Sequence, residues 1–262
     1  MYIYYSIFKK YWKNNEYSTI EYLTDLLLKT SKFITYPIEL YKLMKLQNVV
    51  GVYEIENLKI KEGILCPTPL GFVIYISRID NPNMKRFSLA HELIHTFFYD
   101  YDSQKKLVGK KGQVLNEERL CNYGAASILM PRHLVINFFR TLPINFTSIF
   151  RFAQSFEVSI EAAFLRLVNT DIWKVPFIFW CPLSENDEYF KIQKLISANQ
   201  FVKVIKKDVV IKSGEFLEAY TTNKVTKGFL KINDLKLYLE SRPLLIKGKK
   251  YMVSIVKGVK NG

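Results

Sequence analysis

An H-E-x-x-H motif constrains this chain more than any other feature of its sequence. The motif is His91-Glu92-Leu93-Ile94-His95, within an apolar segment, residues 87–98, that has the pattern of a helix. Histidines at positions i and i+4 lie on one face of a helix, one turn apart, so both imidazoles can bind the same Zn²⁺. The glutamate beside the first histidine can then act on a water at that ion. The motif predicts a hydrolytic zinc site; the alternative is a helix whose two histidines face solvent or a neighbouring carboxylate.

The composition is that of an ordinary globular protein from a reducing compartment. At 262 residues, the chain is long enough for one large domain or two modest ones. Its cysteines, Cys66, Cys121 and Cys181, are far apart and form no C-x-x-C pair, so they predict neither a disulfide framework nor a cysteine zinc site. No apolar run reaches the roughly 18 to 20 residues of a membrane span, and the apolar start lacks the basic segment of a signal peptide. We therefore expect a cytoplasmic protein without a membrane partner.

The net charge is strongly positive and unevenly distributed. It is +14 for the whole chain, and residues 172–262 hold 17 Lys and Arg against eight Asp and Glu, a surplus of nine. A basic balance is compatible with a nucleic-acid partner, with an acidic protein partner, or with solubility alone. The charge therefore excludes none of these partners.

Helical and strand patterns alternate in the first half of the chain, which predicts an α+β domain. The strand expected at Gly71–Ser77 is apolar on both faces, so it should be covered on both; it is either core or also an edge to which an extended substrate adds. The other expected features are helices over 19–32, from Pro37 to Met44 and over 117–130, a strand over 49–55, a turn at Asn81-Pro82-Asn83, an N-cap at Asn116, and a helix stop at Pro131.

The second half changes character near residue 172. Two short helices, expected over 147–154 and 160–168 with Ser159 as the N-cap of the second, have helix-turn-helix spacing. Short alternating stretches follow at 177–180, 201–205, 244–246 and 251–255, the last two joined through Gly248, and they predict a β-rich domain. We therefore divide the chain into a lead segment 1–18, a metallopeptidase domain 19–145, a helix-turn-helix-like segment 146–171, and a basic β-rich domain 172–262 that senses a signal or docks a partner.

A catalytic zinc usually has three protein ligands, so a third must join the two histidines. The candidates are His133, a cysteine, or a carboxylate on the helix that follows. Glu118 is our choice because it lies in the first turn of a helix joined to the motif helix by a loop. Glu117 is its competitor, and spacing does not separate the two. For Cys121, a small buried residue is a simpler interpretation than a ligand.

Two sequence blocks resemble the ImmA/IrrE family of zinc metallopeptidases. They are Arg86-Phe87-Ser88-Leu89-Ala90 with the motif, and Glu118-x-x-x-Asn122 ending Ile128-Leu129-Met130-Pro131. Weaker matches lie at Pro37-Ile38-Glu39-Leu40, at Phe156-Glu157-Val158-Ser159, and at Arg166-Leu167, so the resemblance covers roughly residues 20 to 170. It implies a zincin-like fold, one Zn²⁺ per chain, and Glu118 as the third ligand. The chain departs from the family at Cys121 and Gly124, where the family usually has alanine and an aromatic residue.

The expected chemistry assigns a role to each site residue. Zn²⁺ lowers the pKa of a bound water towards about 7, and Glu92 takes the water proton and passes it to the leaving amine. Asn122 is either a residue that holds a ligand in place or a solvated helix residue. His133 is either an oxyanion stabiliser or, as we favour, a surface histidine.

The expected function is that of a cytoplasmic zinc endopeptidase. Members of the family it resembles cleave transcriptional repressors of mobile elements or stress responses, so the resemblance implies a DNA-binding regulator as the protein substrate. The alternative is a DNA-binding transcriptional regulator with a structural or inactive zinc site. Against direct nucleic-acid binding, the second helix of the helix-turn-helix-like segment offers only Glu161 and Arg166 as polar readers.

Overall fold

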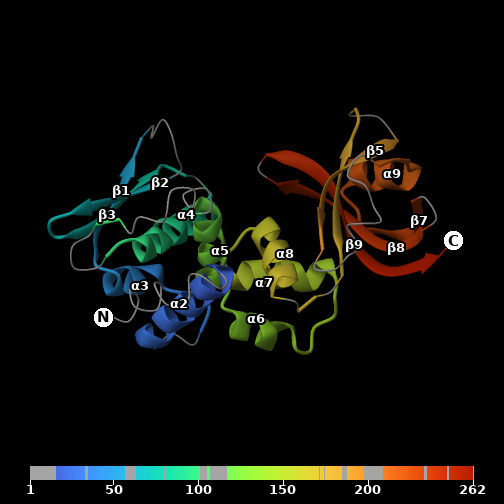
Figure 1. The fold of residues 1–262 in the computed structure, drawn as a ribbon. Coiled ribbons are helices and arrows are strands. Elements are labelled where there is room, and N and C mark those ends of the chain that lie inside the picture. The colour runs from blue at the N-terminus through green and yellow to red at the C-terminus, as the bar shows by residue number, and fades with distance from the viewer. Residues whose placement is uncertain are drawn as a thin grey trace. The chain divides into compact units, whose positions relative to one another are not determined.

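The structure is a computed structural model with two compact units (Figure 1). It describes residues 16–32, 35–56, 63–79, 81–100, 105–106, 117–170, 172–173, 175–184, 188–197, 209–232, 235–246 and 248–261. The first unit comprises Met1–Asn137 and Ala153–Ser159, and the second comprises Phe138–Phe152 and Ile160–Gly262. The lead segment up to residue 15, the expected N-cap Asn116 and the strand expected at 201–205 lie outside the described residues.

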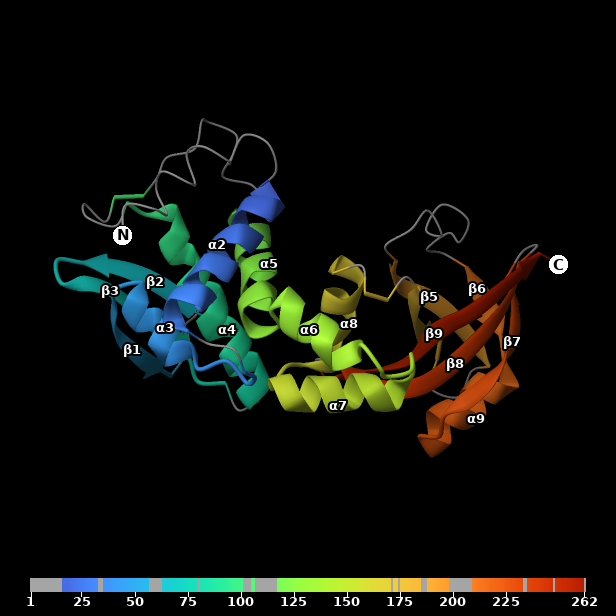
Figure 2. The same cartoon turned by 90° about the horizontal axis from the view of Figure 1, so that it is seen from below.

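Packed helices form the framework of the first unit (Figure 2). They are α2 (Glu16–Ser31), α3 (Leu40–Leu46), α4 (Pro82–His95), which continues into the short 3₁₀ helix η1 (Thr96–Phe98), and α5 (Glu117–Leu129). A Cβ at Gly124 of α5 would lie 2.8 Å from Cγ1 of Ile94 and 2.9 Å from Cγ2 of Ile20. Glycine at this position therefore lets α5 approach α4 and α2 together, and the larger residue that the family usually carries would not fit.

The first unit also holds a mixed three-stranded sheet. Its strands β1 (Val49–Ile55), β2 (Gly63–Thr68) and β3 (Gly71–Ser77) have the order β1-β3-β2, with β1 parallel and β2 antiparallel to β3. Of the two interpretations of β3, that of an edge is wrong, because both of its sides are hydrogen-bonded, and that of a core strand fits. Its continuous apolar run is that of a central strand. Strand β2, which contacts α4, is the edge strand on that side of the described sheet.

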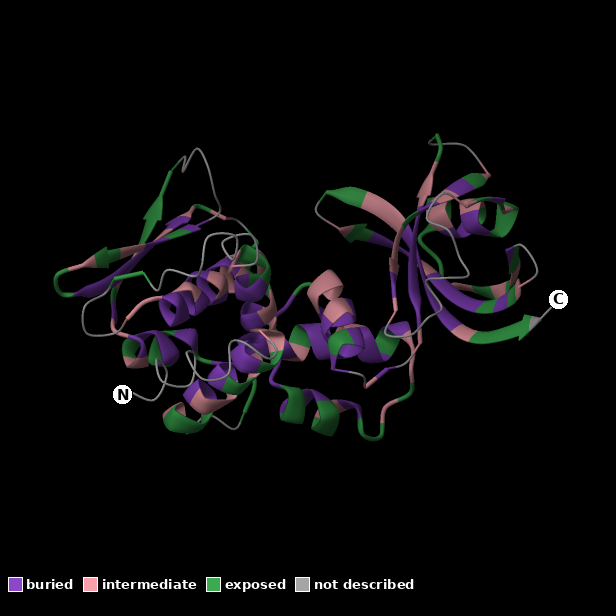
Figure 3. Ribbon diagram, in the orientation of Figure 1, coloured by how far each residue is buried: buried purple, intermediate pink, exposed green. Residues whose placement is uncertain are grey.

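The start of α4 follows from its local sequence. The side-chain oxygen of Asn81 accepts hydrogen bonds from the backbone N–H groups of Asn83 and Met84, at 3.0 and 3.2 Å. Pro82 occupies the first turn, where its missing N–H costs nothing. This cap fixes where the helix begins. Figure 3 shows the buried residues along α4 and α5.

Two helices, α6 (Arg132–Phe139) and α7 (Phe146–Phe156), contribute residues to both units, and α8 (Ile160–Asn169) follows. The remainder is a six-stranded antiparallel sheet, of order β6-β5-β4-β9-β8-β7, with one helix, α9 (Gly214–Thr222). The strands are β4 (Phe177–Pro182), β5 (Tyr189–Ile196), β6 (Val210–Lys212), β7 (Thr226–Ile232), β8 (Leu235–Ile246) and β9 (Lys249–Asn261). The helices and strands together confirm the α+β class and the β-rich C-terminal part. The domain boundaries stay predictions.

Strand β4 explains why its sequence is apolar at every position from 177 to 180. Phe177 and Phe179 contact Phe164 of α8, with ring centroids 4.6 and 5.9 Å away. Ile178 and Trp180 belong to the core on the other side, where Trp180 packs edge-on against Phe216 of α9. Helices therefore cover β4 on both faces, and the alternation of a half-exposed strand is absent.

The hairpin expected at the C-terminus is confirmed. Leu244 pairs with Tyr251 and Ile246 with Lys249, and Gly248 between the strands has a φ of +75°, which glycine adopts without strain. Among the described helices, none has both the length and the apolar character needed to cross a membrane.

Candidate metal centre

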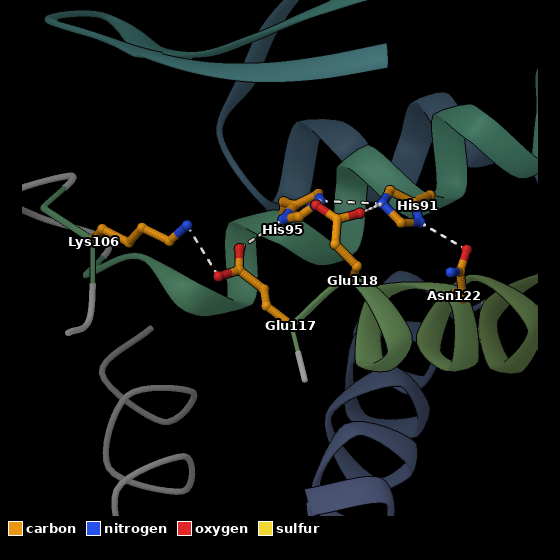
Figure 4. A network of polar contacts seen from close by, with 6 residues as sticks. All are labelled: His91, His95, Lys106, Glu117, Glu118 and Asn122. Carbon is orange, nitrogen blue, oxygen red and sulfur yellow. Dashed lines mark hydrogen bonds and ion pairs between the residues drawn. The ribbon is translucent and has the colours of Figure 1, made fainter. Parts of the chain in front are cut away.

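Helix α4 brings the two motif histidines together (Figure 4). The Nε2 atoms of His91 and His95 lie 3.1 Å apart, and the side chains are 14 and 13% exposed. Two nitrogens bound at about 2.0–2.1 Å to one tetrahedral zinc would be separated by about 3.3 Å. The observed separation therefore fits a shared metal ion.

The first turn of α5 places two carboxylates at this histidine pair. For Glu118, Oε2 lies 3.2 Å from Nε2 of His91, and Oε1 lies 3.9 Å from Nε2 of His95. For Glu117, Oε1 lies 2.8 Å from Nδ1 of His95, on the opposite side of the ring. Glu118 therefore faces the point that both Nε2 atoms share, whereas Glu117 does not.

The Nδ1 atoms of both histidines have partners of their own. Asn122 Oδ1 lies 3.1 Å from Nδ1 of His91. Glu117 Oε1 lies 2.8 Å from Nδ1 of His95. Because these oxygens accept, each ring donates its Nδ1–H and keeps the lone pair on Nε2. This is the tautomer that a metal requires at Nε2.

The local electrostatics favour the same protonation states. Burial lowers the pKa of His91, and the neighbouring His95 lowers it further, so His91 is held in the neutral form that binds metal. Burial alone would raise the pKa of Glu117, but its hydrogen bonds to His95 and Lys106 outweigh burial and lower it. Glu117 is therefore ionised at neutral pH.

A thiol also lies near the histidines. The Sγ of Cys121 and one nitrogen each of His91 and His95 lie within 4.8 Å of one another. Cys121 is completely buried, and this burial, with nearby carboxylates, raises the pKa of its thiol well above the usual range. Two donor sets are thus within reach of one ion: the histidines with Glu118, or the histidines with Cys121.

The remaining motif residue borders a cavity. Glu92 is 4% exposed, and the cavity of about 230 Å³ is lined by residues of β2, α4 and α5, namely Gly63, Phe87, Ser88, His91, Glu92, Glu118 and Asn122. A Cβ at Gly63 would lie 2.9 Å from Cγ of Glu92. No sequence pattern singles out Gly63, because only the packing of β2 over α4 brings it to Glu92.

The site brings together the predicted residues except one. His133 is exposed on α6 and is not among the described residues that line the cavity. Its placement matches the surface interpretation that we favoured. Lys106, whose Nζ lies 3.0 Å from Oε2 of Glu117, is a further neighbour that the sequence did not indicate.

A helix with this motif, packed against a second helix and a small mixed sheet, defines a zinc-metallopeptidase-like fold. Residues 59–168 match the Peptidase_M78 family, described as the IrrE N-terminal-like domain. This match confirms the resemblance to the ImmA/IrrE family over residues 59–168.

A solved structure has a related fold over most of the chain. It is a Mycobacterium tuberculosis transcriptional regulator, with a TM-score of 0.60 at 16% sequence identity, and the match covers 96% of this chain and 79% of that one. At this identity the likeness concerns the fold alone. Among curated proteins, none matches this sequence significantly.

Proposed function

We propose that this chain is a zinc-dependent endopeptidase in which His91, His95 and Glu118 bind one metal ion and Glu92 is the general base. One observation carries the proposal. The Nε2 atoms of the two histidines lie 3.1 Å apart, with a Glu118 oxygen 3.2 Å from the first of them. This arrangement opens onto the cavity that Glu92 also lines. The family match supports a peptidase.

Position and burial favour Glu118 as the third ligand. Glu118 is 53% exposed, and its carboxylate oxygens lie 3.2 Å from Nε2 of His91 and 3.9 Å from Nε2 of His95. Cys121 is completely buried and burial raises the pKa of its thiol, so a metal ion would have to displace the thiol proton before the sulfur could bind. Glu117 is directed at Nδ1 of His95 and already bonded there. Glu118 is therefore the best third donor.

The remaining chemistry follows from the positions of the side chains. A bound Zn²⁺ lowers the pKa of a water and polarises the scissile carbonyl. Glu92 takes a proton from the attacking water and delivers it to the leaving amine. Its burial beside Gly63 keeps the carboxylate at the cavity. Asn122 orients His91 through Nδ1.

The proposed substrate is a protein, specifically a DNA-binding transcriptional regulator in a stress or mobile-element response. Support comes from the family resemblance. The β-rich domain would dock a partner or sense a signal. We place the enzyme in the cytoplasm, in keeping with three cysteines that form no disulfide.

The alternative function, direct DNA recognition through α7 and α8, has less support. Of the two polar residues that α8 could use to read bases, Arg166 is only 1% exposed. The other, Glu161, forms an ion pair with Lys194 of β5 at 2.8 Å. A recognition helix needs several free polar side chains for phosphates and base edges.

The test compares the zinc-loaded wild type with Glu92→Gln, each added to a lysate of the source cells. New protein N-termini are then identified by mass spectrometry. We expect both proteins to bind about one zinc, because Glu92 is not a ligand. Only the wild type should generate new N-termini in a DNA-binding regulator. The cut regulator is then co-expressed with each variant to confirm direct cleavage.

Glu39→Gln is the matched control, because it makes the same chemical change at an exposed residue that pairs with Lys42 on α3. It should cleave like the wild type. Equal cleavage by Glu92→Gln would overturn the assignment of the base. If the Glu92→Gln variant keeps biological function and binds DNA in a salt-sensitive way, the regulator function is the correct one.

A further inference from the structure

The ion pair on the far side of His95 has a role beyond charge balance. We infer that Glu117 is a positioning residue for the metal centre, which orients His95, and that Lys106 holds Glu117 in place. The inference rests on the proposed metal site, but not on peptide hydrolysis. It depends on three consecutive contacts. Figure 4 shows the first two, His95 to Glu117 and Glu117 to Lys106. The third is the backbone pairing of Lys106 with Tyr99.

The first contact determines the orientation of the His95 imidazole ring. Glu117 Oε1 accepts the Nδ1–H of His95 at 2.8 Å, so the Nε2 lone pair is directed at Nε2 of His91 and at Glu118. The Glu117 side chain is only 13% exposed, so water competes little with Glu117 for the Nδ1–H of His95. A carboxylate bonded to Nδ1 fixes the ring orientation and makes Nε2 a stronger donor.

The two histidines differ in this respect. The Nδ1 of His91 is bonded to the neutral amide of Asn122, at the longer distance of 3.1 Å. A hydrogen bond to an ionised acceptor is roughly twice as strong as one between neutral groups. His95 is therefore the more firmly oriented ligand, and Glu117 makes it so.

The second contact holds the carboxylate. Lys106 Nζ lies 3.0 Å from Oε2, the Glu117 oxygen that His95 does not use. Each oxygen of Glu117 thus has its own partner, and rotation of the carboxylate would break one bond or both. The Lys106 side chain is 51% exposed, so its contribution is smaller than that of Glu117 because water screens the pair.

Backbone pairing places Lys106. Residues Tyr99 and Lys106 form an antiparallel bridge, and the N–H of Asp100 donates to the carbonyl of Lys105 at 2.9 Å. The ring of Tyr99 packs edge-on against Phe72 of β3, with centroids 5.3 Å apart. Lys106 is therefore tied to the sheet as well as to Glu117, and it does not reach Glu117 as a free chain end.

The experiment measures the zinc affinity of the full-length chain by competition with a chromophoric chelator, in the variants Glu117→Ala, Glu117→Gln and Lys106→Met. Loss of an outer partner of a metal-bound histidine costs roughly 10- to 100-fold in affinity, and we expect this for Glu117→Ala. Glu117→Gln keeps an acceptor oxygen and should lose less, and Lys106→Met less again. Because Lys106 acts through Glu117, Lys106→Met should have no further effect in the Glu117→Ala background.

Two controls separate positioning from folding. Lys105→Met removes the same charge from the neighbouring residue and should leave zinc affinity unchanged. Thermal unfolding of the metal-free variants should match that of the wild type, and the absorption spectrum of the Co²⁺-loaded Glu117→Ala variant should be altered, because the ring of His95 is no longer fixed. Unchanged affinity and spectrum in Glu117→Ala would overturn the inference while leaving the metal site standing. A wild type that binds no zinc would instead overturn the proposed function.

Discussion

Glu117 and Glu118 are consecutive residues whose carboxylates lie at different nitrogens of His95. Glu117 Oε1 is 2.8 Å from Nδ1, whereas Glu118 Oε1 is 3.9 Å from Nε2. Successive residues of a helix point about 100° apart, so one step along α5 separates the two positions. The structure thereby distinguishes two acids that sequence spacing left equivalent.

The choice of third ligand gives the first prediction. Glu118→Ala should abolish stoichiometric zinc binding, because only two histidine ligands remain. Cys121→Ala should leave zinc binding intact, since the proposed ligands are the two histidines and Glu118. Zinc content after gel filtration, determined by atomic absorption, measures both.

Cys121→Ala is the matched partner of this experiment, because it makes a small change one turn along the same helix. If Cys121→Ala loses zinc and Glu118→Ala keeps it, the site is formed by two histidines and a cysteine. The metal-free variants should share the wild-type circular dichroism spectrum.

The contact between Gly63 and Glu92 gives the second prediction. In Gly63→Ala the new Cβ would lie 2.9 Å from Cγ and 3.0 Å from Oε1 of Glu92, so this proposed general base must move. A displacement of about 1 Å at a reacting group can cost up to about 100-fold in rate. We expect kcat for cleavage to fall, while zinc affinity stays the same.

Leu65→Ala is a suitable comparison for Gly63→Ala, because it lies on the same strand and its change removes core packing. It should lower the thermal stability rather than kcat. Gly63→Ala with wild-type kcat would show that the position of Glu92 is not limiting.

A buried polar network in the β-rich part gives the third prediction. The Nε1–H of Trp180 donates to Oγ of Ser254 at 2.8 Å, and Ser254 also bonds to Ser241 at 2.6 Å. Ser254→Ala leaves the buried indole N–H without its acceptor, which costs about 1–3 kcal/mol in the free energy of unfolding. Urea denaturation followed by tryptophan fluorescence measures the loss.

Ser241→Ala is the control for this network, because Trp180 keeps its bond to Ser254. It should destabilise the protein less than Ser254→Ala does. Equal effects of the two substitutions would mean that the indole bond is not the important one.

The sequence by itself determined the local features of this protein. The i, i+4 spacing placed His91 and His95 on one helical face, and the turn Asn81-Pro82-Asn83 fixed the helix start, because both depend only on backbone geometry within a few residues. The apolar run at 177–180 likewise indicated a strand, which is now seen to be covered on both faces.

Tertiary structure decided everything that depends on how separate elements meet. The order of the strands made β3 central and β2 an edge strand, a choice that the sequence left open. The close packing of α5 on α4 at Gly124 places Glu118 beside Nε2 of His91 and Glu117 beside Nδ1 of His95. Gly63 and Lys106 reach the site from segments outside α4 and α5. Helical spacing defines a face, but only packing determines which side chains meet it.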